Sequence, residues 1–186
     1  MPEFYHVDRV RGRLKAGQVI GLMYDKSATT DKTNRAASYL SMFSDGVTYH
    51  GWEYLLNAER ISPHEDVLGM IEVLAEYIRR SNYPERISRF QSFFACKTIQ
   101  DAERFVSLYP ITTPEGETRH QGDIWLVQCD TVAFEGDMTF LGLGDCWIDA
   151  ITKLNLYWAG ENGPNPLWEV LLRPPVTVVK KVKTLP

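Results

Sequence analysis

The sequence has few cysteines and no long apolar run. Its three cysteines, Cys96, Cys129 and Cys146, are far apart in 186 residues and form no Cys-x-x-Cys pair. This spacing disfavours a disulfide framework and a structural zinc site, and we expect no metal. No apolar run approaches the ~20 residues of a membrane span, so we expect no membrane partner. The chain can fold without disulfides or bound metal ions, since a domain of this size buries roughly 70% of its unfolded surface.

The sequence also lacks an excess of positive charge. Its 20 lysines and arginines face 24 aspartates and glutamates, which gives a net charge of −4. This disfavours a protein that coats duplex nucleic acid, although the composition allows a local basic surface. Residues 1–6 contain no cationic stretch followed by an apolar one. We therefore expect a cytoplasmic protein without an ordinary signal peptide, with secretion or delivery into a host by another route left open.

The chain has the size and composition of one globular domain. Apolar residues make up 44% and charged residues 24% of it, as in ordinary soluble domains. We expect a single domain over residues 1–186, with a helical insertion around 36–82. Predicted helices and short strands alternate irregularly, which favours an α+β fold over a doubly wound sheet. The predicted strands are 4–7, 19–22, 89–96, 124–129, 168–172 and 176–182.

Three helices are predicted from capping residues and apolar periodicity. A capping box at Ser62 and Glu65 predicts a helix over 64–80 that ends before Tyr83-Pro84. Thr98 is a predicted cap for a helix over 98–107. The third helix is predicted over 145–157, with Asp145 as its cap. Its predicted buried stripe is Trp147, Ile148, Ile151 and Leu154.

The remaining polar or Gly- and Pro-rich segments are predicted loops. Residues 25–35 are polar throughout, and residues 160–166 are dense in glycine, asparagine and proline. Residues 110–122 are also predicted to form a loop.

Glu169 lies inside an apolar predicted strand. A charged residue in such a strand is costly unless it is paired or faces a polar cleft, so this carboxylate is a candidate functional group. Strand alternation places it opposite Trp168 and Val170 and on the same face as Leu171. The alternative is a solvated carboxylate on an edge strand.

His6 and Cys146 are further candidates. A lone histidine in an apolar strand is more often a hydrogen-bonded structural residue than a functional one. Gly-Asp-Cys-Trp at a helix start resembles the catalytic segment of papain-like and ovarian-tumour-type cysteine proteases, where the helix dipole lowers the thiol pKa. Those families place the general-base histidine after the cysteine. All four histidines of this chain precede Cys146, so a helix-start cysteine is favoured and a thiol hydrolase is the weaker alternative.

Several segments, in order along nearly the whole chain, resemble the ADP-ribosyltransferase superfamily and in particular an uncharacterised bacterial family of that superfamily. They include a His-bearing first strand, a serine–arginine segment before a middle strand, and a late glutamate strand that runs into a proline turn. The matching segments are Tyr5-His6-Val7, 14–18, Ile87-Ser88-Arg89, 97–102, Tyr157-Trp158 and 169–176.

The resemblance implies a split β-sandwich of two small sheets with peripheral helices. It implies NAD as co-substrate, Glu169 as catalytic carboxylate and His6 as a catalytic and NAD-orienting residue. It places Arg89 on the pyrophosphate, with the cleft lined by Ser88, Phe90, Ser92 and Tyr157, and with Gln91 and Phe93 as further candidates. The implied acceptor is an unidentified macromolecule, protein rather than nucleic acid, as for an effector or toxin-like transferase.

The chemistry fits a carboxylate at position 169. Breaking the nicotinamide–ribose bond develops oxocarbenium-like positive charge, which a nearby carboxylate stabilises. The same group can act as general base towards the acceptor. A protein that binds NAD or another nucleotide without transferring ADP-ribose remains the main alternative.

Overall fold

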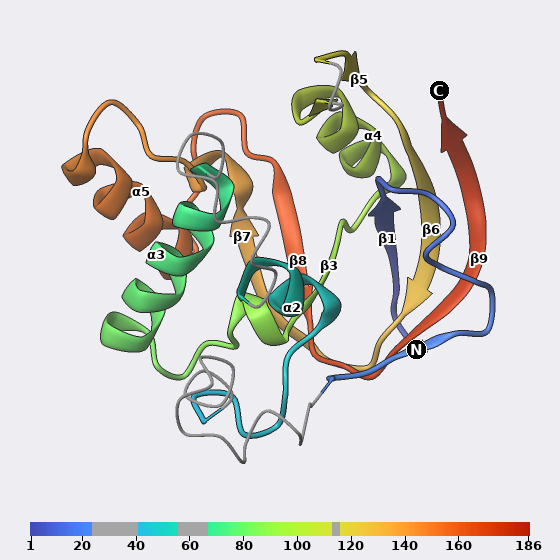
Figure 1. Cartoon of the computed structure of the whole chain (residues 1–186), viewed down its shortest axis with the longest axis horizontal. Helices are drawn as coiled ribbons and strands as arrows, with labels where there is room; N and C mark the ends of the chain where they lie inside the picture. Colours follow the sequence, from blue (N-terminus) through green and yellow to red (C-terminus); the bar gives the residue numbers. More distant parts are fainter. Residues whose placement is uncertain (24–40, 56–66, 113–115) are drawn as a thin grey trace.

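The computed structural model describes residues 1–23, 41–55, 67–112 and 116–186. These residues form a mixed α and β structure with two antiparallel sheets, which confirms the α+β expectation (Figure 1). The four-stranded sheet has the order β1 (Glu3–Asp8), β6 (Gly122–Gln128), β9 (Val176–Leu185), β2 (Val19–Ile20). The three-stranded sheet has the order β3 (Phe93–Ala95), β8 (Trp168–Leu172), β7 (Val132–Asp137).

The two sheets meet where β1 lies beside the end of β3. Tyr5 and Cys96 exchange two backbone hydrogen bonds of 2.9 and 2.7 Å. Apolar side chains from both sheets pack between them, among them Phe4, Trp125 and Val170. Because strand alternation sends Val170 into this core, Glu169 and Leu171 face the opposite side, where the helices pack.

The helices cover different sheets. On one side of the three-stranded sheet lie α3 (Val67–Asn82) and α5 (Trp147–Ala159), which contact each other. On the four-stranded sheet, α4 (Ile99–Leu108) contacts β1 and β6. The short helix α2 (Tyr49–Leu55) packs beside the 3₁₀ turn η3 (Arg89–Gln91). A second such turn, η4 (Met138–Phe140), follows β7.

Two of the predicted helices have the expected ends. α3 ends at Asn82, before Tyr83-Pro84, as expected from the restriction on residues that precede proline. Thr98 caps α4, because its Oγ1 accepts a hydrogen bond from the Asp101 N–H at 3.0 Å. The predicted capping box at 62–65 and the predicted loop 25–35 lie outside the described residues.

The prediction for α5 was wrong in its start and for three of the four residues of its buried face; Leu154 is buried as predicted. The helix begins at Trp147, with Cys146 rather than Asp145 at the N-cap position. Trp147, Ile148 and Ile151 are 59%, 70% and 41% exposed. The helix buries another face instead, because packing against α3 and β7 selects among apolar residues that periodicity alone cannot rank. The buried residues are Ala150, Leu154, Tyr157 and Trp158.

Three further corrections concern strands. Residues 89–91 form the turn η3, so only the end of the predicted strand 89–96 pairs as β3. The predicted loop 110–122 contains a small hairpin of β4 (Ile111–Thr112) and β5 (Thr118–Arg119). β7 was not predicted; its sequence Val-Ala-Phe-Glu-Gly-Asp has weak strand propensity, and its place depends on pairing with β8.

Candidate functional site

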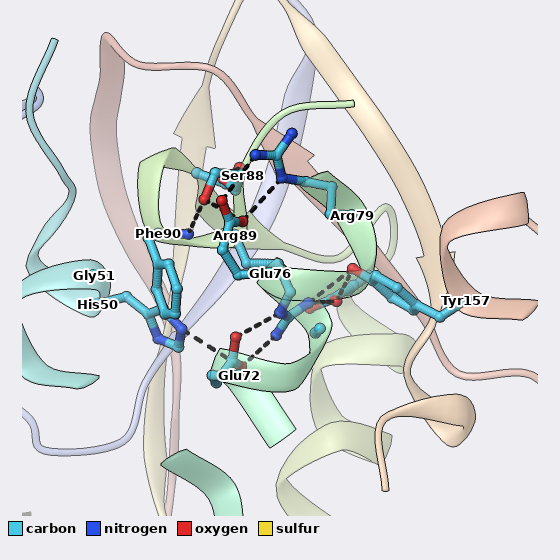
Figure 2. Close-up of polar contacts among 12 residues, drawn as sticks. His50, Gly51, Glu72, Glu76, Arg79, Ser88, Arg89, Phe90 and Tyr157 are labelled. Atoms are coloured by element: carbon cyan, nitrogen blue, oxygen red, sulfur yellow. Dashed lines mark hydrogen bonds and ion pairs between the residues drawn. The ribbon is translucent and has the colours of Figure 1, made fainter. Parts of the chain in front are cut away.

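A buried ionic cluster around Arg89 lies between the three-stranded sheet and the helices (Figure 2). Arg89 Nε and Nη2 donate to the two carboxylate oxygens of Glu72, each at 2.8 Å. Arg89 Nη1 donates to Glu169 Oε1 and, at 2.8 Å, to the Tyr157 hydroxyl. The Tyr157 hydroxyl in turn donates to Glu169 Oε1 at 2.5 Å. The guanidinium is thus shared between two carboxylates and a phenol.

Four separate elements supply this cluster. Glu72 comes from α3, Arg89 from η3, Tyr157 from α5 and Glu169 from β8. The side chains of Glu72, Arg89 and Glu169 are only 9%, 5% and 4% exposed. A buried charge is tolerated only when it is paired and hydrogen-bonded, so these four groups depend on one another.

The turn η3 sets the direction of Arg89. The Ser88 hydroxyl accepts a hydrogen bond from the Phe90 N–H at 3.1 Å and donates to Glu76 Oε2 at 2.8 Å. Phe90 leaves the other side of the turn and is fully buried against Phe43 and Val47. The capped turn therefore directs Arg89 into the ionic cluster and Phe90 into an apolar cluster.

Glu76 is the centre of a second buried group that ties α3 to η3. Its oxygens accept from Arg79 Nε and Nη2 at 2.9 and 2.8 Å, and from Arg80 Nε at 2.7 Å. Together with the bond from Ser88, these contacts fix the helix against the turn that carries Arg89. They satisfy the Glu76 carboxylate fully and give this group a structural role.

Two glycines permit the close packing of the cluster. A Cβ at Gly51 would lie 2.4 Å from the Phe90 carbonyl oxygen, so α2 can approach η3 only with glycine there. A Cβ at Gly136 would lie 2.4 Å from a ring carbon of Tyr157. Gly136 is the register partner of Glu169, so this gap on β7 admits the phenol that bonds the carboxylate.

The charges of the cluster shift several pKa values. Burial opposes the charged form of Glu72, but Arg89 and then His50 outweigh it and hold the Glu72 pKa well below its usual range. Burial also opposes the charge of Arg89, yet Glu169 and Glu72 raise its pKa well above the ordinary value. Burial and Glu169 raise the pKa of Tyr157 far above its usual range, against the effect of Arg89. At neutral pH Glu72 is therefore a carboxylate, Arg89 a guanidinium cation and Tyr157 a neutral phenol.

His50 stands at the outer end of this row of charges. Its Nε2 lies 3.5 Å from Glu72 Oε1, which is long for a hydrogen bond, and its side chain is 24% exposed. Its ring packs edge-on against Phe94 at 4.4 Å between centroids, and the Arg89 guanidinium lies 4.6 Å from the centre of the Phe94 ring. His50, Glu72, Arg89 and Glu169 therefore form a continuous row from the surface to the interior.

His6 lies beside β3 rather than in this row. Its Nδ1 donates to the Phe94 carbonyl oxygen at 2.6 Å, and its ring is 4.3 Å from that of Phe93. Burial lowers the pKa of His6, against the smaller effects of that hydrogen bond and of Asp8, so the ring is neutral at physiological pH. With the proton on Nδ1, Nε2 carries the acceptor lone pair.

The structure brings some of the predicted site residues together and separates others. Arg89, Tyr157 and Glu169 are in direct contact. The Arg89 guanidinium is buried and hydrogen-bonded to two carboxylates, so it is not open to solvent. Ser92 is 1% exposed and donates to the Ser88 carbonyl oxygen at 2.7 Å. Ser88 and Phe90 are likewise buried, so in this conformation these three stabilise the turn.

Sequence reasoning missed Glu72 and His50. Glu72, Glu76 and Arg79 recur at intervals of four and three residues, the spacing of a helix face. That spacing could have indicated a charged stripe facing inward, because apolar positions of the same helix, Ile71 and Ala75, immediately precede Glu72 and Glu76 and are buried.

In the described ranges, no hydrogen bond joins a cysteine to a histidine. Cys146 is exposed and makes no capping bond with its side chain. His50 lies against Glu72, and His120 Nδ1 bonds the Val106 carbonyl oxygen at 3.3 Å. Burial first, then Asp101 and Glu169, raise the pKa of Cys96 to about 12, which makes this thiol a poor nucleophile.

A hollow of about 280 Å³ lies elsewhere, at the corner between β8 and β9, where residues 129–131 and 173–175 line it. In the described ranges, no three histidine, cysteine or acidic side chains are grouped to hold a metal ion. No helix in those ranges is long and apolar enough to cross a membrane.

The fold and the cluster define an α+β protein in which two antiparallel sheets and their helices enclose an arginine–carboxylate–tyrosine network. The chain belongs to a protein family of unknown function (DUF2441), whose family model matches residues 4–184. That range includes His6, Glu72, Arg89, Tyr157 and Glu169. No curated protein matches the sequence.

Proposed function

We propose that this protein is an NAD-dependent ADP-ribosyltransferase with Glu169 as its catalytic carboxylate. The observation that supports this most is the adjacency of three segments distant in sequence. β1, which carries His6, bridges to the end of β3 at Cys96, and β3 pairs with β8, which carries Glu169. The resemblance to ADP-ribosyltransferases rests on these same three segments in this order.

The chemistry of the proposed reaction assigns a role to each group. The nicotinamide–ribose bond breaks, nicotinamide leaves with the bonding electron pair, and an acceptor nucleophile forms the new bond to ribose. The Glu169 carboxylate stabilises the developing positive charge and takes the acceptor's proton. Neutral His6 accepts a hydrogen bond from a ribose hydroxyl through Nε2, which orients the co-substrate.

The burial of Glu169 adds a requirement to this proposal. Glu169 is 3% exposed, and both Arg89 and Tyr157 bond its Oε1. Both bonds fall on Oε1, so the proposal requires NAD to reach Oε2, or Arg89 and Tyr157 to give up Oε1. In the second case Arg89 keeps its two bonds to Glu72, so the buried guanidinium stays paired.

The same burial favours one second candidate, a protein that binds NAD or another nucleotide without transferring ADP-ribose. In that case Glu169 is a structural partner of Arg89 and Tyr157. Nucleotide binding then depends on the surface near His6 and not on the carboxylate.

Nicotinamide release under single-turnover conditions, beside an NAD titration by thermal shift, separates the two candidates. Transfer predicts release by the wild type and a loss of about 10² to 10³ in rate for Glu169→Gln, with NAD stabilisation retained. Glu161→Gln, which changes an exposed carboxylate, is the matched control, and Cys146→Ala should also release nicotinamide at the wild-type rate. NAD stabilisation without release by the wild type supports the binding protein. No stabilisation by NAD refutes the transferase and refutes the binding protein as a binder of NAD.

Tyr157→Phe keeps the proposal testable if Glu169→Gln unfolds. This substitution removes the hydroxyl that covers Glu169 but keeps the ring and the carboxylate. Transfer predicts that its nicotinamide release stays within about tenfold of the wild type or rises. A loss as large as that expected for Glu169→Gln, in a folded variant, would place catalysis on the phenol instead.

A further inference from the structure

The helix α3 carries its charges inside and its large apolar residues outside. Met70, Val73 and Tyr77 are 48%, 53% and 70% exposed. They recur at intervals of three and four residues, so they share one helix face. The ionic groups around Arg89 account for the charged residues that the helix buries, which are Glu72, Glu76 and Arg79. They do not account for an apolar stripe on the outer side of the helix.

The helix α5 exposes a second apolar stripe. The sequence pattern predicts Trp147, Ile148 and Ile151 as buried, but they are 59%, 70% and 41% exposed. Ile151 follows Trp147 by four residues and Ile148 by three, so these side chains are neighbours on the helix surface. A stripe with the periodicity of a buried face that one chain leaves in solvent indicates that another surface covers it.

The two helices form one outer layer of the molecule. Both lie on the same side of the three-stranded sheet, away from the four-stranded sheet (Figure 1). They touch each other: Asn82 Nδ2 donates to Asn155 Oδ1 at 2.8 Å, and Trp158 Nε1 donates to the Ala75 carbonyl oxygen at 2.8 Å. Ile151 lies one turn before Asn155 on α5. Because the inner faces of α3 and α5 pack on the protein, their exposed faces together form its outer surface on this side.

This outer surface is free of charge at its exposed positions. Among residues 69–82 and 147–159, ten are exposed and none of them is charged, although charged residues make up 24% of the chain. Depletion of charge, with apolar and aromatic residues in its place, distinguishes the core of a protein interface from other surface. We call these ten residues the outer helix face. They are Met70, Val73, Tyr77, Ser81, Asn82, Trp147, Ile148, Ile151, Thr152 and Ala159.

The apolar area of the outer helix face matches the need of a stable dimer. With ~200 Å² for a fully exposed residue of this size, the exposed fractions of its six large apolar residues amount to about 700 Å². The largest apolar patch of an ordinary monomer measures about 300–600 Å². A standard interface takes about 800 Å² from each partner. The six residues therefore supply most of one side of such an interface.

We propose that the outer helix face binds a second copy of this chain in a two-fold symmetric dimer. In such a contact residues near the axis meet their own copies, so any charge there would repel itself. A face without exposed charge meets this condition. A strongly acidic or basic partner would instead require complementary charge on the face. Helices that lie on membranes carry lysines and arginines on their polar side, and neither helix exposes one at the positions given above. This association is independent of ADP-ribose transfer.

The test is sedimentation velocity of the full chain between 1 and 100 μM. The wild type should sediment as a dimer with Kd of about 10 μM or lower, since interfaces of this size range from micromolar to picomolar. Val73→Glu with Ile148→Glu should raise Kd at least ~100-fold, because the contact would then bury two uncompensated carboxylates from each chain. Both positions are exposed helix positions, so the fold should be retained, which circular dichroism verifies. The wild-type Tm should also rise with protein concentration, a readout that needs no variant.

Val10→Glu with Leu108→Glu is the matched control. It adds the same charge at apolar positions that are 56% and 51% exposed but lie outside the outer helix face, so it should dimerise like the wild type. A wild type that is monomeric at 100 μM, with a Tm independent of concentration, overturns the proposal. So does an equal loss in both double variants, or growth into open-ended assemblies. A monomer that sediments with phosphatidylcholine vesicles would assign the face to a lipid surface and also overturn it.

Discussion

Gly136 and Glu169 are register partners on β7 and β8, and the missing side chain of the glycine makes room for the phenol that bonds the carboxylate. The Tyr157 ring occupies the space that a Cβ at position 136 would fill. The absence of a side chain at position 136 on β7 therefore allows Tyr157 to reach Glu169 on β8.

Gly136→Ala should destabilise the protein by about 1–3 kcal/mol, because the new Cβ would overlap the rings of Tyr157 and Phe134 at 2.4 and 2.8 Å. Urea unfolding measures the change. Gly142→Ala is the control, since no atom lies within 4 Å of a Cβ there, and should have almost no effect. Equal stability of the two variants would show that Tyr157 has room to move.

Arg89→Met should cost about 3–5 kcal/mol of unfolding free energy, because it leaves Glu72 and Glu169 buried without their shared partner. Arg89→Lys should fall between this variant and the wild type, since one ammonium cannot make the bidentate bond to Glu72 and also reach Glu169. Arg119→Met, in an exposed pair, should change stability by less than about 1 kcal/mol. A small effect of Arg89→Met would mean that the cluster is solvated.

The stability of the protein should fall with acid through Glu72. Its pKa is depressed in the fold, so its contribution is present above its unfolded pKa of about 4.3 and is lost as pH falls below that value. In that range the wild type should lose up to about 1.4 kcal/mol per pH unit more than Glu72→Gln. Urea unfolding between pH 3 and 6 measures both slopes. Parallel slopes would show that Glu72 is protonated equally in both states.

Asp137 should control the order of the loop before Glu169. It is fully buried, and its carboxylate accepts the N–H groups of Thr139, Gly163 and Leu167 at 3.0, 2.9 and 2.9 Å. Asp137→Ala leaves these donors unpaired and should cost about 3 kcal/mol or more.

Amide hydrogen exchange gives the specific readout for Asp137. Protection should drop at the three bonded amides in Asp137→Ala by more than global destabilisation explains. Asp130→Ala, at an exposed position, should leave protection unchanged. Unaltered exchange at Gly163 and Leu167 in the Asp137 variant would assign the anchoring of this loop to other contacts, such as those of Arg104 with residues 165–166.

The predicted strands that the structure retains have β-branched and aromatic residues. β1, β6, β8 and β9 were predicted within a few residues because their side chains favour a pleated, half-buried surface. β7 has Glu, Gly and Asp in its second half and gave no such signal. Its conformation comes from hydrogen bonds to β8, which local propensity does not contain.

The candidate site was predicted only in part, for a similar reason. Glu169 was a candidate from its place in an apolar strand as well as from the resemblance, while Arg89 and Tyr157 came from the resemblance alone. The structure places all three in contact. Glu72 shares a helix face with Glu76 and Arg79, a spacing that fits either a solvated or an inward-facing stripe, and the packing of α3 over η3 decides between them.

The sequence by itself determined the local structure of this protein: the end of α3 before a proline, the Thr98 cap of α4, and the apolar strands that build both sheets. These depend on neighbouring residues and on periodicity, so a few consecutive side chains suffice. The tertiary structure decided which face of α5 is buried, where β7 pairs and how Glu169 is held. Those outcomes depend on groups up to 97 positions apart, Glu72 and Glu169, that meet only after the sheet and the helices pack and exclude water.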